Sequence, residues 1–227
     1  QFQLYIMDSS GGQLAWAAEK FLVTTAADYK DPEKVAGKVA QLAAQCNAAA
    51  SSPYAKAKWM HDWLIYNADY DTSDNPSYRP EGVLLLGKGV CDSYSRSYSM
   101  LLNRVGVEAR YVSNTRGNHS WNVVKLGGIW YHVDVTWDDP VGGGKENHRF
   151  FLISDERIIE IGQKLHDSWK DSDGVQTVCP YNWGEAPANP PSHADLVKNM
   201  YGDAEPRQPR PNANRGDNVT GGSPYQD

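Results

Sequence analysis

The sequence lacks both a long apolar segment and an excess of positive charge. Its longest strictly apolar run covers residues 14–18, whereas a membrane-spanning helix needs ~20 predominantly apolar residues. The chain carries 22 basic and 28 acidic residues, with a formal net charge of -6. Nucleic-acid-binding domains usually show a basic patch or stripe. We therefore expect neither a membrane span nor a nucleic-acid partner.

Cysteine is scarce as well. The 227 residues contain only Cys46, Cys91 and Cys179. No two of them lie close enough in sequence for the ligand spacing of a zinc finger or zinc ribbon. We predict no metal and no other cofactor. Because three is an odd number, at least one thiol stays outside any disulfide, and pairing of Cys46 with Cys179 is left open.

The composition is that of a globular domain up to about residue 184. Hydrophobic residues make up 40% of the chain, with 8 Trp and 13 Tyr, which is enough to bury a core. Residues 185–227 instead hold 7 of the 13 prolines and only two aromatic residues. We predict a folded domain over residues 1–184 and a proline-rich C-terminal tail over residues 185–227. The first residue is Gln rather than Met, so we expect a processed chain with a secreted or cell-surface location.

Helical patterns come first along the chain. Asp31-Pro32 and Ser52-Pro53 are typical helix starts. A third helix is expected to begin at Cys91 and to end at Gly106. Alternating patterns follow, and they predict strands at residues 107–113, 119–126, 129–135 and 150–153. Because helices precede an antiparallel sheet, the predicted fold class is α+β.

Three residues point to chemistry. Cys91 opens a helix, where free N–H groups and the helix dipole favour a thiolate. His119 and Asp134 lie on the two strands of a hairpin whose turn is Gly127-Gly128. Across a two-residue turn at 127 and 128, opposite residues have numbers that sum to 255, so Asp134 faces position 121 and is diagonal to His119. The sequence therefore predicts a His–Asp pair on one face of the sheet.

Each of these residues alone has an ordinary interpretation. Cys91 could be an inert buried thiol, His119 a surface residue of a strand, and Asp134 a solvated charge. Together they match an activated nucleophile: Asp134 orients His119, and His119 takes the proton of Cys91. Trp121 lies on the same face and is either a wall of the cleft or plain core. We expect a solvated loop at Asp69, Asp71 and Asp74, and turn or cap residues at Asp138 and Asp139, in both cases rather than metal ligands.

Three blocks of sequence carry a resemblance to a known family. They are residues 87–95 (GKGVCDSYS), residues 119–124 (HSWNVV) and residues 130–140 (WYHVDVTWDDP). They resemble the transglutaminase-like superfamily in its bacterial secreted form, from about residue 59 to residue 166. The resemblance implies a papain-like α+β catalytic core at about residues 53–166. It implies Cys91 as nucleophile, His119 as general base and acid, and Asp134 as the residue that orients the histidine.

The reaction implied by this resemblance is acyl transfer or hydrolysis at a protein or peptide amide through a thioester, with an amine or water as acceptor. The tetrahedral oxyanion needs hydrogen-bond donors. Candidates are the Cys91 backbone N–H and a side chain from the end of the preceding helix, Tyr70 or Asn67. Two alternatives stay open: a cysteine peptidase or isopeptidase acting on peptide or cell-wall bonds, and a non-catalytic binding module of the same fold.

Overall fold

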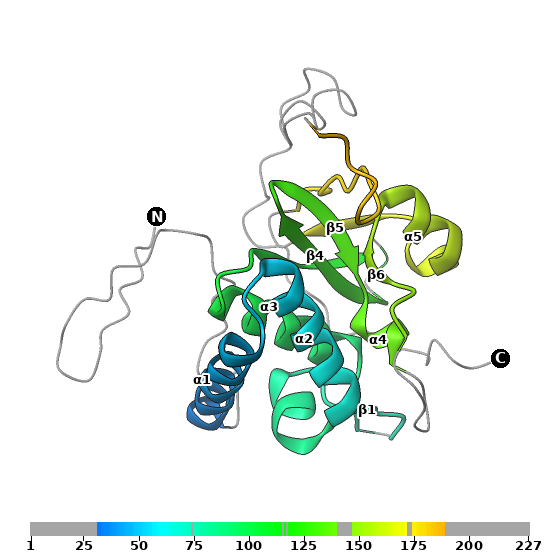
Figure 1. The fold of residues 1–227 in the computed structure, drawn as a ribbon. Helices are drawn as coiled ribbons and strands as arrows, with labels where there is room; N and C mark the ends of the chain where they lie inside the picture. The colour runs from blue at the N-terminus through cyan, green and yellow to red at the C-terminus, as the bar shows by residue number, and fades with distance from the viewer. Residues whose placement is uncertain are drawn as a thin grey trace, which may run out of the picture.

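The computed structural model describes residues 31–188 except 74, 115, 117, 140–146 and 172–173 (Figure 1). Asp74 and nearly all of the proline-rich tail lie outside the described residues, so the predictions made for them are not tested. In the described part of the chain, no helix is long and apolar enough to cross a membrane.

Three long helices form one layer of the molecule. They are α1 (Pro32–Ala49), α2 (Pro53–Asn67) and α3 (Cys91–Arg104). The predicted start of α2 is confirmed, because the Ser52 hydroxyl accepts a hydrogen bond from the Ala55 N–H at 3.1 Å. The predicted end of α3 is confirmed at Gly106, whose φ of +81° is a left-handed conformation that favours glycine.

The second layer is a five-stranded antiparallel sheet in the order β6-β5-β4-β3-β7. Its strands are β3 (Ala109–Asn114), β4 (Ser120–Leu126), β5 (Ile129–Val133), β6 (Phe151–Ile153) and β7 (Trp169–Asp171). Helices followed by an antiparallel sheet confirm the predicted α+β class. Strand β7 was not predicted; it returns to pair with β3 at the sheet edge.

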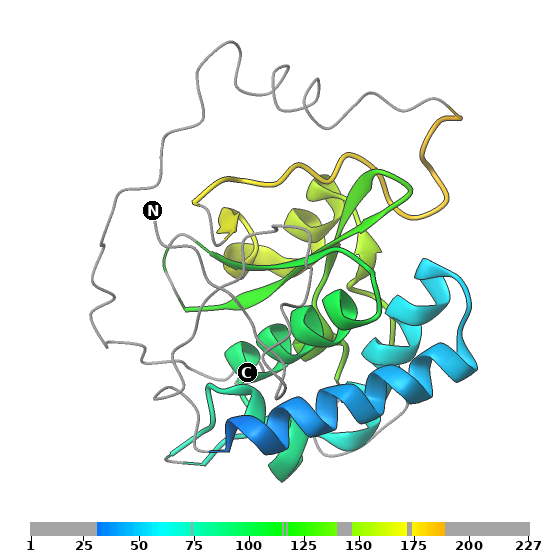
Figure 2. The same cartoon turned by 90° about the vertical axis from the view of Figure 1, so that its left-hand side faces the viewer.

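The two faces of the sheet are buried in two separate cores. Val124 and Leu126 of β4 pack with residues of α1, α2 and α3, whereas Trp121 and Val123 belong to the core on the other face. This division follows the two-residue period of a strand. Helix α5 (Asp155–Gly162) contributes Ile158 to the second core. Figure 2 shows α3 lying between α1 and the sheet, with α5 beyond the sheet.

Short elements complete the described chain. Strand β1 (Asp69–Tyr70) runs parallel to β2 (Lys88–Gly89), with the five-residue π-helix η2 (Gly82–Leu86) between them. Beyond β5 comes the single-turn helix α4 (Val135–Asp138), and the 3₁₀ turn η3 (Gln163–Leu165) follows α5. The strand predicted over residues 129–135 therefore ends early, at Val133.

Candidate active site

Cys91 is the first residue of α3, as predicted. The preceding strand β2 pairs with β1 and thereby fixes the chain that leads into the helix. Cys91 is partly exposed, whereas Cys46 and Cys179 are buried. All three thiols are free, so the disulfide left open between Cys46 and Cys179 is not formed. The partly exposed thiol thus lies at the N-terminal end of a helix.

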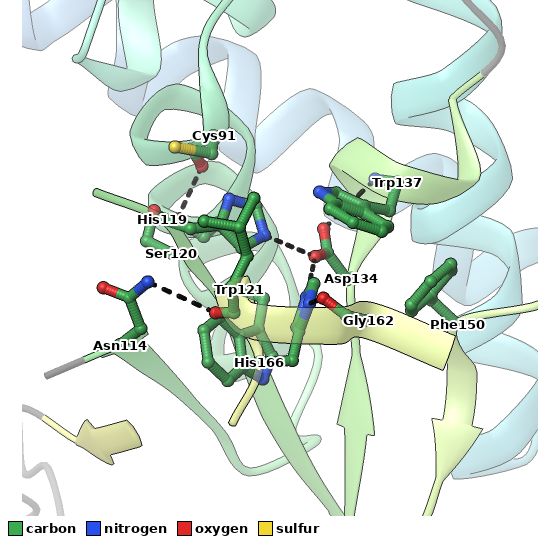
Figure 3. Close-up of polar contacts among 12 residues, drawn as sticks. Cys91, Asn114, His119, Ser120, Trp121, Asp134, Trp137, Phe150, Gly162 and His166 are labelled. Carbon is green, nitrogen blue, oxygen red and sulfur yellow. Dashed lines mark hydrogen bonds and ion pairs between the residues drawn. The ribbon is translucent and has the colours of Figure 1, made fainter. Parts of the chain in front are cut away.

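The β4–β5 hairpin has the predicted register. Asn122 pairs with Val133 and Leu126 with Ile129, so opposite residues sum to 255. Asp134 lies one residue beyond the strand and is the N-cap of α4, because its Oδ1 accepts the Trp137 N–H at 3.2 Å. Its Oδ2 lies 2.6 Å from Nε2 of His119 (Figure 3). The predicted His–Asp pair is therefore present.

The charges of this pair stabilise each other. Burial by itself disfavours the charged form of His119, but the charge of Asp134 and hydrogen bonds to Asp134 and Cys91 outweigh it and raise the pKa of His119 to about 10. Burial acts against the carboxylate as well, yet His119 and His166 together hold the pKa of Asp134 well below its usual range. At neutral pH the arrangement is thus an imidazolium bound to a carboxylate.

The ring of His119 connects the carboxylate to the thiol. Its Nε2 is engaged by Asp134, which leaves Nδ1 for the Cys91 side chain, whose interaction with the ring helps to raise the pKa of His119. On the face of the imidazole, the buried Trp121 ring stacks at 5.6 Å between centroids and an interplanar angle of 20°. Asp134 and Trp121 thus fix the orientation of the His119 ring.

The three supporting residues predicted from the sequence have different positions. Tyr70 lies on β1 opposite Gly89, and the charges of Cys91 and Asp134 act on its hydroxyl; burial first, and these charges second, raise the pKa of Tyr70. Asn67 is exposed, and its amide donates to the Trp63 carbonyl at 2.7 Å, so the structure does not bring it to the site. Trp121 is 1% exposed and belongs to the core rather than to an open wall.

Sequence reasoning gave no role to His166, yet its ring touches the site. His166 Nε2 lies 2.7 Å from Oδ2 of Asp134, the same oxygen that faces His119 (Figure 3). The contact joins residues 32 positions apart. The segment after β6 has no hydrophobic period or motif from which this contact could be predicted. Local sequence therefore held no signal for this histidine.

A second polar cluster lies apart from Cys91. His61 of α2 lies 3.1 Å from carboxylate oxygens of both Asp62 and Asp138, and His148 lies 2.6 Å from Asp62. His61, Asp62 and His148 are close enough together to hold a metal ion. The Lys58 ammonium already pairs with Asp62, however, and a positive charge there disfavours a further cation. An ion-pair network accounts for the cluster.

Three of the acidic residues expected in a loop or turn are buried: Asp71, Asp138 and Asp139. Asp138 is 0% exposed and accepts the Phe150 N–H at 2.9 Å in addition to its contact with His61. Asp71 is 6% exposed and accepts the Ser73 N–H at 3.0 Å. The prediction of a solvated residue was wrong for Asp71, because an N–H group and the Lys88 ammonium, which local composition does not reveal, compensate its carboxylate.

Comparison with known proteins gives one family match and two curated relatives. Residues 40–135 match the family model described as the transglutaminase-like superfamily. Among curated relatives, a Homo sapiens protein called kyphoscoliosis peptidase is 27% identical over 170 residues, which cover 66% of this chain and 24% of that protein. The Mus musculus protein of the same name is 27% identical over 101 residues, covering 36% and 15%. The chain thus spans about a quarter or less of the length of these relatives.

Solved structures give more distant matches. A crystal structure of a TGase is 17% identical with a TM-score of 0.42, over 58% of this chain and 38% of that one. A candidate cysteine protease from Cytophaga hutchinsonii is also 17% identical, with a TM-score of 0.40, over 64% and 55%. TM-scores this low carry no argument about activity.

The resemblance to the transglutaminase-like superfamily is confirmed by the family match. The matched segment, residues 40–135, contains Cys91, His119 and Asp134. It also contains α2, α3 and the β4–β5 hairpin, which are the elements that place these side chains.

Proposed function

We propose that this chain is a thiol-dependent enzyme that acts on protein or peptide amides through Cys91, His119 and Asp134. The observation that carries the proposal is the buried His119–Asp134 pair, 2.6 Å apart, beside a partly exposed thiol at a helix N-terminus. A histidine oriented by a carboxylate is the usual activator of a cysteine nucleophile. The family match over residues 40–135 supports the same assignment.

In the proposed reaction the Cys91 thiolate attacks the carbonyl carbon of the amide, in the first place the side-chain amide of glutamine. The S–C bond forms, and the carbonyl oxygen becomes an oxyanion that the Cys91 N–H and the Tyr70 hydroxyl are placed to stabilise. The C–N bond then breaks. His119 gives its proton to the departing nitrogen, which leaves as ammonia, and the acyl group stays on sulfur as a thioester.

The second half of the reaction regenerates the thiol. A primary amine or a water molecule gives a proton to the now neutral His119 and attacks the thioester carbon. The product is a cross-linked amide in the first case and a glutamate in the second. With His119 protonated again, Cys91 leaves as a thiolate beside an imidazolium, the form that is stabilised in such pairs.

A peptidase is the second candidate function. The observation in its favour is that the two curated relatives are called peptidases, although this chain covers only 24% and 15% of them. The chemistry at Cys91 is the same, but the amide that breaks belongs to the peptide backbone. A third possibility, a binding module without activity, is disfavoured by the intact Cys–His–Asp set.

One assay separates these functions. The purified chain is incubated with a glutamine-containing peptide, with and without a fluorescent primary amine, and both ammonia release and peptide mass are measured. The proposal expects ammonia in both reactions and amine incorporation or deamidation by mass, all absent in Cys91→Ala. Peptide cleavage without ammonia would instead support the peptidase. Equal signals from Cys91→Ala and the unmodified chain would contradict catalysis at this thiol.

A further inference from the structure

Asp134 contacts a second imidazole that the proposed mechanism does not use. Its Oδ2 lies 2.6 Å from Nε2 of His119 and 2.7 Å from Nε2 of His166. The side chain of Asp134 is fully buried, that of His166 is fully buried, and that of His119 is 2% exposed. No water can therefore replace either contact. Figure 3 shows both rings directed at the same carboxylate oxygen.

The surroundings of His166 fix the orientation of its ring. Nδ1 lies 3.0 Å from the carbonyl oxygen of Gly162, at the end of α5. A Cβ on Gly162 would come within 2.2 Å of this Nδ1, so the close approach needs glycine. The rings of Trp121 and Trp137 pack around His166 at centroid distances of 4.7 and 4.8 Å. The imidazole is thus clamped with one nitrogen towards Gly162 and the other towards Asp134.

The position of the proton on the His166 ring determines which of its two neighbours receives a hydrogen bond. The Gly162 carbonyl and the Asp134 carboxylate both only accept hydrogen bonds. A neutral His166 has a single N–H, and the charged carboxylate is the stronger acceptor, so this proton lies on Nε2 and is donated to Oδ2 of Asp134. Burial, and after it the charge of His119, oppose a full positive charge on His166, and the pKa of His166 is lowered although Asp134 attracts the proton. The shared oxygen therefore couples the protons of the two histidines.

We propose that His166 is a positioning residue for the candidate active site: it holds Oδ2 of Asp134 against His119 and, through the proton directed at this oxygen, withdraws negative charge from the carboxylate. The inference rests on the proposed function. The other titratable groups coupled to these three residues are Cys91, which acts on His119, and Asp138 and Tyr70, on which the charge of Asp134 acts. Removing the imidazole leaves Asp134 more negative towards His119, which then holds its proton more tightly.

The test measures how fast iodoacetamide alkylates Cys91 between pH 6 and pH 11.5, by peptide mass, because this probe needs no knowledge of the substrate. In His166→Phe, which keeps an aromatic ring but has no donor, the inflection at which His119 loses its proton is expected to move up by at least half a pH unit. Ammonia release is expected to fall on the order of 10- to 100-fold in kcat with little change in KM, since a hydrogen bond to a charged group is lost. His166→Gln, which keeps a donor, is expected to recover most of both.

A matched control is His61→Gln. His61 is also a buried histidine between two oxygen acceptors, but it contacts Asp62 and Asp138 and none of Cys91, His119 and Asp134. This variant is expected to lower the melting temperature without moving the alkylation profile. Gly162→Ala is a second perturbation, which displaces the His166 ring without removing it and should move the profile in the same direction as His166→Phe.

Several results would overturn the inference. A folded His166→Phe with the original profile and kcat would show that the ring only fills space, and so would an equal shift in His61→Gln. His119, Asp134 and His166 also lie close enough together to hold a metal ion. If dialysis against EDTA abolishes rapid alkylation and added Zn²⁺ restores it, the positioning role is wrong. Failure of the proposed function looks different, because Cys91 then reacts no faster than free cysteine at pH 6 in the unmodified chain.

Discussion

The side chain of Asp134 makes two different kinds of contact at once. The Oδ1 atom of Asp134 caps α4 by accepting the Trp137 N–H, while Oδ2 faces two imidazoles. The same carboxylate therefore fixes the backbone just beyond the hairpin and the histidine that we propose as the activator of the thiol. A substitution of Asp134 that keeps the contact with the Trp137 N–H and weakens the contact with the imidazoles distinguishes its structural role from its catalytic role.

Asp134→Asn is the first such substitution. Asparagine caps a helix about as well as aspartate, so α4 keeps its start. The amide cannot neutralise an imidazolium, and it favours the wrong tautomer of His119. We expect kcat for ammonia release to fall on the order of 10³- to 10⁴-fold, as in other triads, while the far-UV circular dichroism spectrum stays unchanged. A loss smaller than 10-fold would contradict the role of Asp134.

The second prediction concerns the oxyanion. Tyr70 lies where the charge of Cys91 reaches its hydroxyl, whereas Asn67, three residues earlier, is exposed and bonded to Trp63. We expect Tyr70→Phe to lower kcat on the order of 10²-fold, the usual cost of removing one oxyanion donor. Asn67→Ala is the control and should keep kcat within about 2-fold. A larger loss of kcat in Asn67→Ala than in Tyr70→Phe would instead indicate that Asn67, at the end of α2, is the oxyanion donor.

At the scale of helices and strands, the features that depend on residues close together in the sequence could be predicted. The two-residue Gly127-Gly128 turn fixes every pairing of β4 with β5, so the diagonal of His119 and Asp134 followed from the sequence. Contacts between segments that lie far apart in the sequence could not be predicted in this way. The pairing of β7 with β3 and the approach of His166 to Asp134 depend on how the chain packs after β6. Tyr70 and Asn67 could not be told apart either, because the pairing of β1 with β2 decides between them.

The starts of α1 and α2 differ in a way that gives a third prediction. The Ser52 hydroxyl accepts the Ala55 N–H, but Asp31 makes no side-chain cap hydrogen bond, although both precede a proline. Ser52→Ala should lower the free energy of unfolding by about 1 kcal/mol. Asp31→Ala should change it by less than about 0.5 kcal/mol, since only an exposed pair with Lys34 is lost. Urea unfolding at pH 7 measures both, and equal effects would contradict the capping argument.

At the scale of the whole molecule, the junction between the helical layer and the sheet is polar. Asp138, the last residue of α4, and Asp139, which follows it, reach into the helical layer. Asp138 contacts His61 of α2, and Asp139 accepts a hydrogen bond from the Tyr94 hydroxyl of α3. Buried groups of this kind stabilise a fold only while each keeps the right protonation state. The stability of the protein should therefore depend on pH through this junction.

Asp139 is the residue of this junction for which the pH dependence of stability can be stated most specifically. Burial, with the charge of Asp69, outweighs the hydrogen bond from Tyr94 and raises the pKa of Asp139 to about 7. The folded state thus keeps a proton that the unfolded chain releases near pH 4. A raised pKa stabilises the fold fully below the unfolded value, and this contribution is lost as the pH rises from about 4 to 7.

Asp139→Asn removes this titration and keeps an oxygen that can accept from Tyr94. We expect the free energy of unfolding of the variant, relative to the unmodified chain, to be higher at pH 8 than at pH 5 by roughly 1–3 kcal/mol. Urea unfolding at the two pH values measures the difference. Asp167→Asn is a suitable control, because Asp167 is exposed on the surface and its pKa is lowered by Arg116 rather than raised. If Asp139→Asn has the same effect at both pH values, Asp139 is ionised in the folded protein throughout, and the junction does not set the pH dependence.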